Sequence, residues 1–212
     1  MNPRDIILYG GSFDPIHLGH LTMAAYAIDY LHAETLIFIP AARSPHKMTV
    51  PIASPSQRIE MVRMVIEGMD RYQVSECELN RPQPSYTFDT ICEFRLRYGP
   101  EAVLYWLVGA DAVPELPRWF RIDELLDLCR VCILCRAGFE ISSLQTLEGQ
   151  LSRRHIEQLG RDVIPTPLVD ISSSQIRQKI ALGQDVRAFL PPRVWEFIRQ
   201  NQLYGSGTVP VS

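Results

Sequence analysis

The chain has 212 residues, of which 46% are hydrophobic and 21% charged, and its formal net charge is -3. This size and composition fit one globular domain with a sizeable core, and the slight acidity argues against general affinity for nucleic acid or anionic membranes. Because no apolar run approaches the length of a membrane span and the first residues lack the pattern of a signal peptide, we expect a cytoplasmic enzyme or binding protein.

Strand-like apolar runs alternate with segments of helical periodicity along the whole chain. The expected strands are residues 5–9, 35–40, 72–79, 103–108, 131–135 and 163–169. The expected helices are residues 20–31, 56–69, 87–98, 123–128, 144–159, 174–182 and 192–200. This alternation predicts an α/β fold with a parallel sheet covered by helices. We expect a single domain over residues 1–204, helical from about residue 173 onward, and a disordered tail at residues 205–212.

The segment GGSFDPIHLGH, residues 10–20, joins the first expected strand to the first expected helix. Such a turn lies at the carboxyl edge of an α/β sheet, where ligands bind. Gly10 and Gly11 allow close approach of a ligand to backbone N–H groups that hold phosphate oxygens. His17 and His20 share one face at the positive end of a helix dipole, near the surface. These features predict an anion pocket; for the histidines alone, a surface accident or a metal site stays open, although further zinc ligands are not evident.

A second helix start carries polar residues in the segment ISSSQIR, residues 171–177. The serines are N-cap residues, and Arg177 falls in the expected first turn. A helix dipole disfavours a cation there unless an anion binds beside it, and a guanidinium matches phosphate oxygens in bidentate fashion. An ordinary capped helix with a solvated arginine is the alternative.

Three further features complete the set of candidates. Asp111 follows a strand end and Gly109, where a carboxylate accepts hydrogen bonds from ribose hydroxyls or caps a helix. The long irregular stretch at residues 41–55 has the length of a functional loop. The cysteines at positions 129, 132 and 135 fall three apart in or beside an expected strand, so they point to opposite faces. We therefore expect core cysteines and no metal site.

The ordered set of these segments resembles one family. GGSFDPIHLGH resembles the signature G-G-[ST]-F-D-P-x-H-x-G-H of the nucleotidylyltransferase superfamily, and specifically of the bacterial nicotinate-nucleotide adenylyltransferases; ISSSQIR resembles its second signature. Residues 44–47 (SPHK), 84–87 (PSYT), 109–111 with Trp119, and 190–205 resemble further family segments. Any one of these motifs would be weak, but the ordered set is specific and covers nearly the whole chain.

The resemblance implies a Rossmann-like doubly wound sheet and an enzyme that transfers the adenylyl group of ATP to nicotinate mononucleotide, giving deamido-NAD and pyrophosphate. It implies catalysis by His17, His20 and Arg177. It implies ATP binding by Gly10, Gly11, Ser12, Phe13, His17, His20, Gly109, Asp111, Ile171, Ser173, Ser174 and Arg177. It implies binding of nicotinate mononucleotide by Ser12, His46, Lys47, Thr87, Trp119, Phe120 and Arg136.

The expected cofactor is Mg²⁺, held mainly by the substrate phosphates. The resemblance implies that Trp119 stacks on the pyridine ring, and Phe120 stands where relatives often carry tyrosine; a place in the core is the alternative for both. The expected partners are the two small-molecule substrates, without nucleic acid or membrane, and the chain can form a homo-oligomer or act alone.

One alternative function is that of an enzyme of the same superfamily with another acceptor, such as phosphopantetheine or nicotinamide mononucleotide. A nucleotide-binding module without catalysis is the other.

Overall fold

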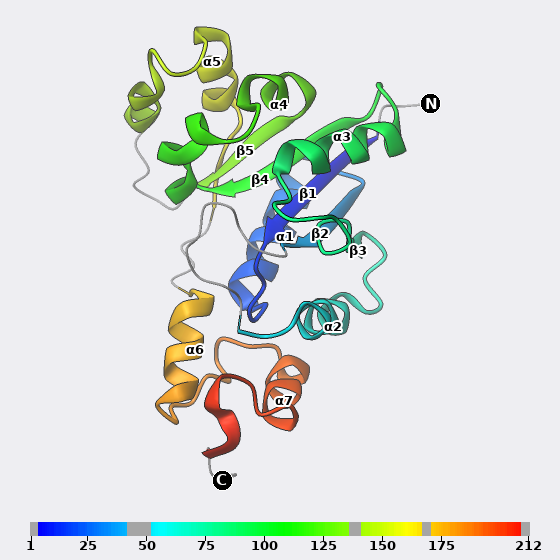
Figure 1. The fold of residues 1–212 in the computed structure, drawn as a ribbon, viewed down its shortest axis with the longest axis vertical. Helices are drawn as coiled ribbons and strands as arrows, with labels where there is room; N and C mark the ends of the chain where they lie inside the picture. Colours follow the sequence, from blue (N-terminus) through cyan, green and yellow to red (C-terminus); the bar gives the residue numbers. More distant parts are fainter. Residues whose placement is uncertain (1–3, 42–51, 136–140, 167–170, 209–212) are drawn as a thin grey trace.

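The computed structural model describes residues 4–41, 52–135, 141–166 and 171–208. Within these ranges six parallel strands form one central sheet in the order β3-β2-β1-β4-β5-β6 (Figure 1). The strands are β1 (Asp5–Gly11), β2 (Thr35–Pro40), β3 (Tyr72–Val74), β4 (Val103–Gly109), β5 (Arg130–Cys135) and β6 (Val163–Pro165). The chain winds outward from β1 to β3 and then returns to β4 on the other side of β1. This is the predicted doubly wound sheet.

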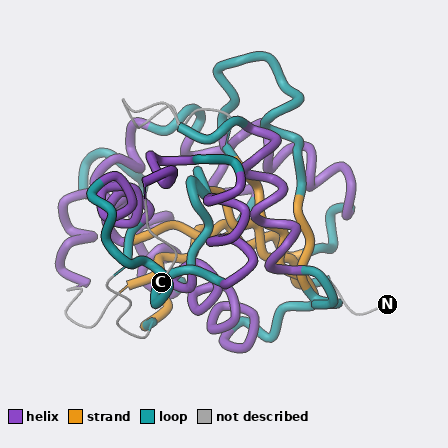
Figure 2. The backbone as a smooth tube through the Cα atoms, turned by 90° about the horizontal axis from the view of Figure 1, so that it is seen from below, coloured by secondary structure: helices purple, strands orange, loops and turns teal. Residues whose placement is uncertain are grey.

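Helices cover both faces of the sheet, as the tube view shows (Figure 2). The α-helices are α1 (Leu18–Tyr30), α2 (Pro55–Ile66), α3 (Thr87–Tyr98), α4 (Ile122–Leu128), α5 (Arg153–Arg161), α6 (Ser173–Ala181) and α7 (Pro192–Gln200). Side chains from helices α1, α2, α6 and α7 form one buried layer together with Ile7 and Leu107 of the sheet. Those of α3, α4 and α5 share the other layer with Ile6 and Leu104. Neighbouring strand residues thus serve opposite cores, as the two-residue period of a strand requires.

Three 3-10 helices supplement these elements, η1 (Ala110–Arg118), η2 (Ile141–Leu147) and η3 (Leu203–Thr208). α6 and α7 lie at one end of the molecule, next to the chain's C-terminal part (Figure 1). η3 contacts both helices, and α7 also packs on α2. Residues 205–208 of the predicted tail therefore belong to a described element, whereas residues 209–212 lie outside the described residues.

The prediction of a single helix over residues 144–159 is wrong. η2 ends at Leu147, and α5 begins only at Arg153. Gly149 has φ +77° between them, in the left-handed region that favours glycine, and the Ser152 hydroxyl caps α5 by accepting from the His155 N–H at 3.2 Å. A glycine turn followed by an N-cap outweighs the helical periodicity that runs across this segment.

Two predicted strands are shorter in the structure. β3 ends at Val74, because the Glu76 carbonyl then accepts from the N–H groups of Leu79 and Asn80 and turns the chain. β6 ends at Pro165, and residues 167–169 of its predicted range lie outside the described residues.

The cysteines of β5 and its approach are core residues, as predicted. Cys129 belongs to one buried layer and Cys132 to the other, so the two thiols do not converge. Burial raises the pKa of Cys132 to about 12, which keeps that thiol protonated and inert.

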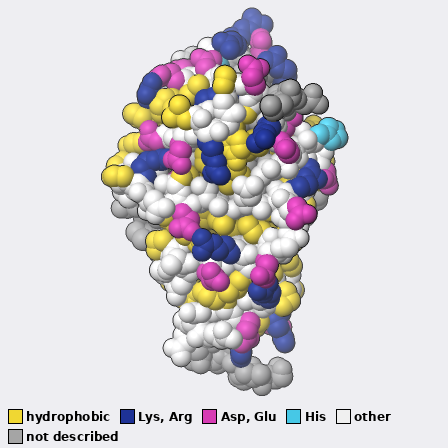
Figure 3. All heavy atoms as spheres, turned by 90° about the vertical axis from the view of Figure 1, so that its right-hand side faces the viewer, with side chains coloured by type: hydrophobic (Ala, Val, Ile, Leu, Met, Phe, Trp, Pro, Cys, Tyr) yellow, Lys and Arg dark blue, Asp and Glu magenta, His cyan; other side chains and the backbone are white. Residues whose placement is uncertain are grey.

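On the face shown in Figure 3, basic and acidic side chains are interspersed. None of the described helices combines the length and the apolar character that crossing a membrane requires.

Candidate active site

A cavity of about 210 Å³ opens at the carboxyl ends of β1 and β4. These two strands are neighbours whose following connections run in opposite directions, so the cavity lies at the switch point where ligands bind in doubly wound folds. Seven of the predicted site residues line it, namely Gly10, Gly11, Ser12, Thr87, Gly109, Asp111 and Trp119. The fold therefore brings together residues from four separate segments of the chain.

The glycines at the strand ends are required by the protein's own side chains. A Cβ atom on Gly10 would approach the Trp106 ring to 2.5 Å, and one on Gly11 would approach the Phe13 ring to 3.0 Å. A Cβ on Gly109 would overlap the Asp111 carboxylate. Neighbouring side chains thus occupy the space that a Cβ atom would need at these three glycines, all of which line the cavity.

The two histidines form a stacked pair at the start of α1. Their ring centroids are 3.7 Å apart with an interplanar angle of 26°, and the His17 N–H donates to His20 Nδ1 at 3.3 Å. The prediction that both lie near the surface is wrong for His17, which is only 4% exposed as the N-cap residue of α1. Burial lowers the pKa of His17 to about 4, so this ring is neutral at pH 7.

The His17 ring keeps a polar atom available for a ligand. Its Nδ1 is buried and has no hydrogen-bond partner among the described residues. A buried polar atom without a partner costs about 1–3 kcal/mol, so such an atom in a native site suggests a ligand contact. One N–H group at the start of α1 is not available to a ligand, because the Leu18 N–H donates to the Phe189 carbonyl at 2.9 Å.

Phe13 supports the histidine pair from behind. Its side chain is fully buried, and its ring meets the His20 ring edge-on at a centroid distance of 5.0 Å and the Tyr9 ring at 5.6 Å. Any contact of Phe13 with ATP is therefore restricted to its backbone. The ring itself positions His20.

The second predicted segment docks onto the turn that carries His17. Ser173 Oγ donates to the Pro15 carbonyl at 2.9 Å, and Arg177 Nη1 donates to the Asp14 carbonyl at 2.7 Å. Arg177 Nη2 also contacts Ser174 Oγ at 3.2 Å. Since α6 begins at Ser173, Arg177 lies in its second turn and not in the first, so the predicted dipole penalty does not apply. Ser172, as predicted for this serine run, caps the helix.

Asp14 is a central residue of the site to which the sequence analysis assigned no role. Its carboxylate is 2% exposed and accepts from the Ile52 N–H at 2.8 Å, the Ala53 N–H at 3.1 Å and the Tyr204 hydroxyl at 2.6 Å. Arg177 Nη1 lies 3.8 Å from Asp14 Oδ2. Asp14 thus joins the histidine turn to the start of α2, to α6 and to the C-terminal region.

Arg58 is a second such residue, fully buried on α2. Its Nη1 donates to the Ser12 carbonyl at 2.8 Å and to the Ala41 carbonyl at 2.7 Å. The pattern of apolar residues in α2 does not predict that this arginine points into the protein. Its contacts fix the backbone at the ends of β1 and β2.

The histidine pair, Phe13 and the α6 residues do not line the cavity, but Tyr9 does, and its ring centroid is 6.1 Å from that of His20. The remaining predicted residues do not line it either. Phe120 is 45% exposed and stacks on the Tyr86 ring at 4.6 Å, so it does not line the cavity. Ile171 packs against the helical core beside α6. His46, Lys47 and Arg136 lie outside the described residues.

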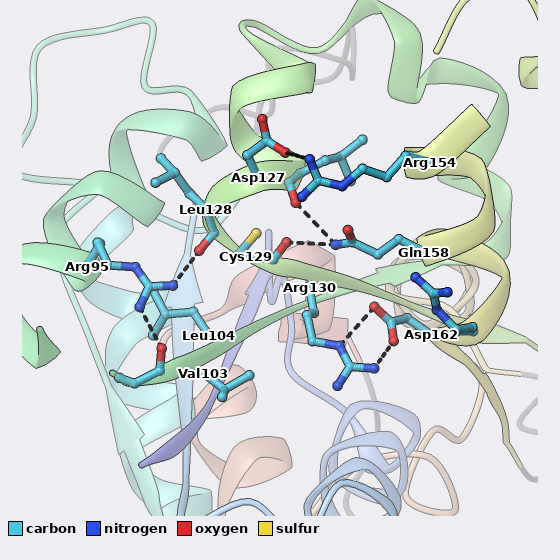
Figure 4. A pocket seen from close by; sticks show the side chains of 13 residues that line it. Arg95, Val103, Leu104, Asp127, Leu128, Cys129, Arg130, Arg154, Gln158 and Asp162 are labelled. Atoms are coloured by element: carbon cyan, nitrogen blue, oxygen red, sulfur yellow. Dashed lines mark hydrogen bonds and ion pairs between the residues drawn. The ribbon is translucent and has the colours of Figure 1, made fainter. Parts of the chain in front are cut away.

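A larger cavity of about 380 Å³ lies at the amino ends of β4 and β5 (Figure 4). Several of its arginines are already bonded within the protein: Arg95 donates to backbone carbonyls, Arg130 pairs with Asp162, and Arg154 pairs with Asp127. It is also at the sheet edge opposite to the one that binds ligands in such folds. The smaller cavity at the carboxyl edge is therefore the better candidate.

Comparison with known proteins identifies the class. The model of the cytidylyltransferase-like family matches residues 8–179, so the chain belongs to this family. The chain is 37% identical over 204 residues to a probable nicotinate-nucleotide adenylyltransferase of Moorella thermoacetica, covering 95% of this chain and 92% of that protein. It is 34% identical over 199 residues to one of Clostridium tetani, covering 93% of this chain and 97% of that protein. The chain therefore belongs, within this class, to the nicotinate-nucleotide adenylyltransferase family.

Solved structures show the same fold. The structure of Plasmodium falciparum nicotinic acid mononucleotide adenylyltransferase complexed with NaAD superposes with a TM-score of 0.72, at 16% sequence identity, over 95% of this chain and 98% of that chain. A second structure of the same protein, complexed with APC, superposes with a TM-score of 0.67.

Proposed function

We propose that the protein is an enzyme that transfers the adenylyl group of ATP to nicotinate mononucleotide, releasing pyrophosphate and forming deamido-NAD. The observation that carries this proposal is the switch-point cavity with the stacked histidine pair beside it, in a chain that belongs to the nicotinate-nucleotide adenylyltransferase family.

The chemistry requires no protein nucleophile. A phosphate oxygen of the mononucleotide attacks the α-phosphorus of ATP in line, and the bond from this phosphorus to the oxygen that bridges to the β-phosphate breaks. The electron pair of that bond leaves with pyrophosphate. Because the attacking phosphate is already a nucleophile, catalysis consists of positioning and of stabilising the developing charge.

His17, His20 and Arg177 supply that stabilisation in our proposal. The unpartnered Nδ1 of the neutral His17 ring is available to a phosphate oxygen when it carries the proton, and a bound triphosphate favours the protonated imidazole. Arg177 keeps guanidinium donors beyond its bonds to the Asp14 carbonyl and to Ser174 Oγ, because a guanidinium has five. Ser173 and Ser174 at the start of α6 place further donors beside it.

Thr87 and Trp119 supply the pyridine site. Thr87 is the first residue of α3, whose N-cap Tyr86 makes no side-chain cap, so N–H groups of this first turn are free to hold a carboxylate. Trp119 presents its ring to the same cavity, where it stacks on the pyridine. His46, Lys47 and Arg136 remain proposed contacts to the mononucleotide on the family resemblance.

The residues present fit a magnesium ion that arrives with ATP. The Asp111 carboxylate lines the cavity, and no group of three or more histidine, cysteine, aspartate or glutamate side chains among the described residues could cage a metal. Mg²⁺ commonly uses one or two carboxylates, substrate phosphates and water. When bound, the ion would neutralise charge on the leaving pyrophosphate.

Pyrophosphate release tests the proposal. The enzyme is incubated with ATP and nicotinate mononucleotide, nicotinamide mononucleotide or phosphopantetheine in turn. We expect the fastest release with nicotinate mononucleotide. Faster release with phosphopantetheine would assign the enzyme to another acceptor, and ATP binding without release would indicate a nucleotide-binding module.

A further inference from the structure

Glu78 is a buried carboxyl group in the wall of the cavity that the reaction described above does not use. The residue is 6% exposed and lines the cavity together with Thr87 and Trp119. Its Oε1 accepts from the Thr90 hydroxyl at 2.9 Å. Its Oε2 has no hydrogen-bond partner among the described residues. One oxygen is thus fixed by α3, and the other is available to a ligand.

The groups around Glu78 leave it without a dedicated cation. Arg81 is the nearest positive charge, but its Nη1 donates to Ser85 Oγ at 2.9 Å and Thr90 Oγ1 at 3.1 Å, and its Nη2 pairs with Glu93 on α3 at 2.6 Å.

The other titratable groups near Glu78 are neutral or negative. Cys77 precedes Glu78 in the chain and has a pKa raised by burial, so its thiol is neutral at pH 7. The Tyr9 hydroxyl of β1 and the Asp111 carboxyl of η1 line the same cavity. Burial raises the pKa of Glu78 to about 7, with the Thr90 hydrogen bond and the Arg81 charge opposing this rise. The carboxyl group therefore changes charge near neutral pH.

We propose that Glu78 is a specificity-determining residue that faces the substituent of the pyridine ring and carries a proton when that substituent is a carboxylate. This inference rests on the proposed function. Glu78 shares its wall of the cavity with the residues proposed to hold the ring, whereas the histidine pair and α6 lie outside that wall. The placement therefore points to the pyridine end of the mononucleotide.

The protonation state decides which substituent is accepted. Protonated Glu78 donates a hydrogen bond to the nicotinate carboxylate, whereas two carboxylates side by side repel each other. Ionised Glu78 accepts from the N–H₂ group of nicotinamide. The proton comes from solvent, so binding of nicotinate mononucleotide above neutral pH takes up a proton and binding of the amide does not.

The ratio of kcat/KM for the acid to kcat/KM for the amide measures this effect. Titration of the mononucleotide phosphate and of His17 affects both substrates and cancels in the ratio. We expect the wild-type ratio to fall by about tenfold for each pH unit above 7, as the protonated fraction of Glu78 falls. The ratio reaches its lowest value when other contacts alone hold the nicotinate carboxylate. A ratio that stays flat from pH 6 to 9 would overturn the proposal.

Two variants sharpen the test. Glu78→Gln cannot titrate, so its ratio should be flat over the same pH range. Glu76→Gln is the matched control: it lies two residues away, pairs with Arg63 and does not line the cavity. It should keep the wild-type profile. A pH-dependent ratio retained in Glu78→Gln would overturn the role of Glu78.

Calorimetry on the wild-type enzyme tests the same inference without a variant and without turnover. Binding of each mononucleotide is measured at pH 7.5 in two buffers with different ionisation enthalpies. We expect about half a proton or more to be taken up with the acid beyond any taken up with the amide, as follows from a carboxyl group that is mostly ionised at that pH. Equal proton uptake with both would refute the role of Glu78. Absence of turnover with tight binding would instead count against the proposed function.

Discussion

Replacement of Asp14 should destabilise the whole arrangement around the histidine turn. In Asp14→Asn, a side-chain oxygen placed at the Oδ1 position keeps the bonds from Ala53 and Tyr204, but the amide group then faces the Ile52 N–H. One hydrogen bond to a charged group is worth about 1.5–3 kcal/mol. The substitution also removes the negative charge that faces the buried Arg58 guanidinium and the partly buried Arg177 guanidinium.

The free energy of unfolding should therefore fall by about 3–5 kcal/mol, the range for breaking a buried ion pair. Tyr204→Phe removes only one bond to the carboxylate and should cost less, about 1.5–3 kcal/mol. Urea denaturation followed by circular dichroism measures both, and the exposed Asp70→Asn serves as the matched control with no change expected. An Asp14→Asn variant within about 1 kcal/mol of the wild type would refute this account of the turn.

Three further predictions concern the groups around the phosphates. His17→Ala and His20→Ala should each lower kcat by roughly 10²-fold, the effect of losing one preorganised donor, and a variant with near-normal kcat would remove that histidine from the mechanism. Arg177→Lys keeps the charge but loses the planar fork, so kcat/KM for ATP should still fall, and full activity would contradict a bidentate role. The pH dependence of stability gives the third: because the pKa of His17 is about 4 when folded and near 6.5 when unfolded, the unfolded chain binds more protons in between, and stability falls as pH drops from 6.5 to 4. The His17 contribution to this loss should reach about 3 kcal/mol at pH 4 and is absent in His17→Asn. It is measured as the difference between the two proteins, because burial of Glu78, whose pKa rises from 4.5 to about 7, lowers stability in both as pH rises through that range. Urea midpoints across pH 4.5 to 7.5 for both proteins decide it.

The sheet and the histidine pair were predictable because both depend on local patterns. Alternating apolar runs identify the parallel strands, and the three-residue spacing of His17 and His20 places their rings together at the start of a helix. Cys129, in extended backbone directly before β5, and Cys132 within β5 likewise lie in opposite layers, as their three-residue spacing predicts.

The roles of Asp14 and Arg58 were not predictable, because their partners are distant in the chain. Asp14 meets Ala53 and Tyr204, 39 and 190 residues away. The break at Gly149 is different: the glycine and the Ser152 cap are visible in the sequence, but the helical periodicity of the flanking residues obscured them. The burial of His17, which lowers its pKa, was not predicted from the sequence either.

Adenylyl transfer requires that the α-phosphorus of ATP is the point of attack. The most direct measurement uses ATP labelled at either the α- or the γ-phosphate, with nicotinate mononucleotide as acceptor and separation of the products. We expect the α label in deamido-NAD and the γ label in pyrophosphate, in equal amounts. Transfer of the γ label to the mononucleotide, or its release as inorganic phosphate, would contradict adenylyl transfer.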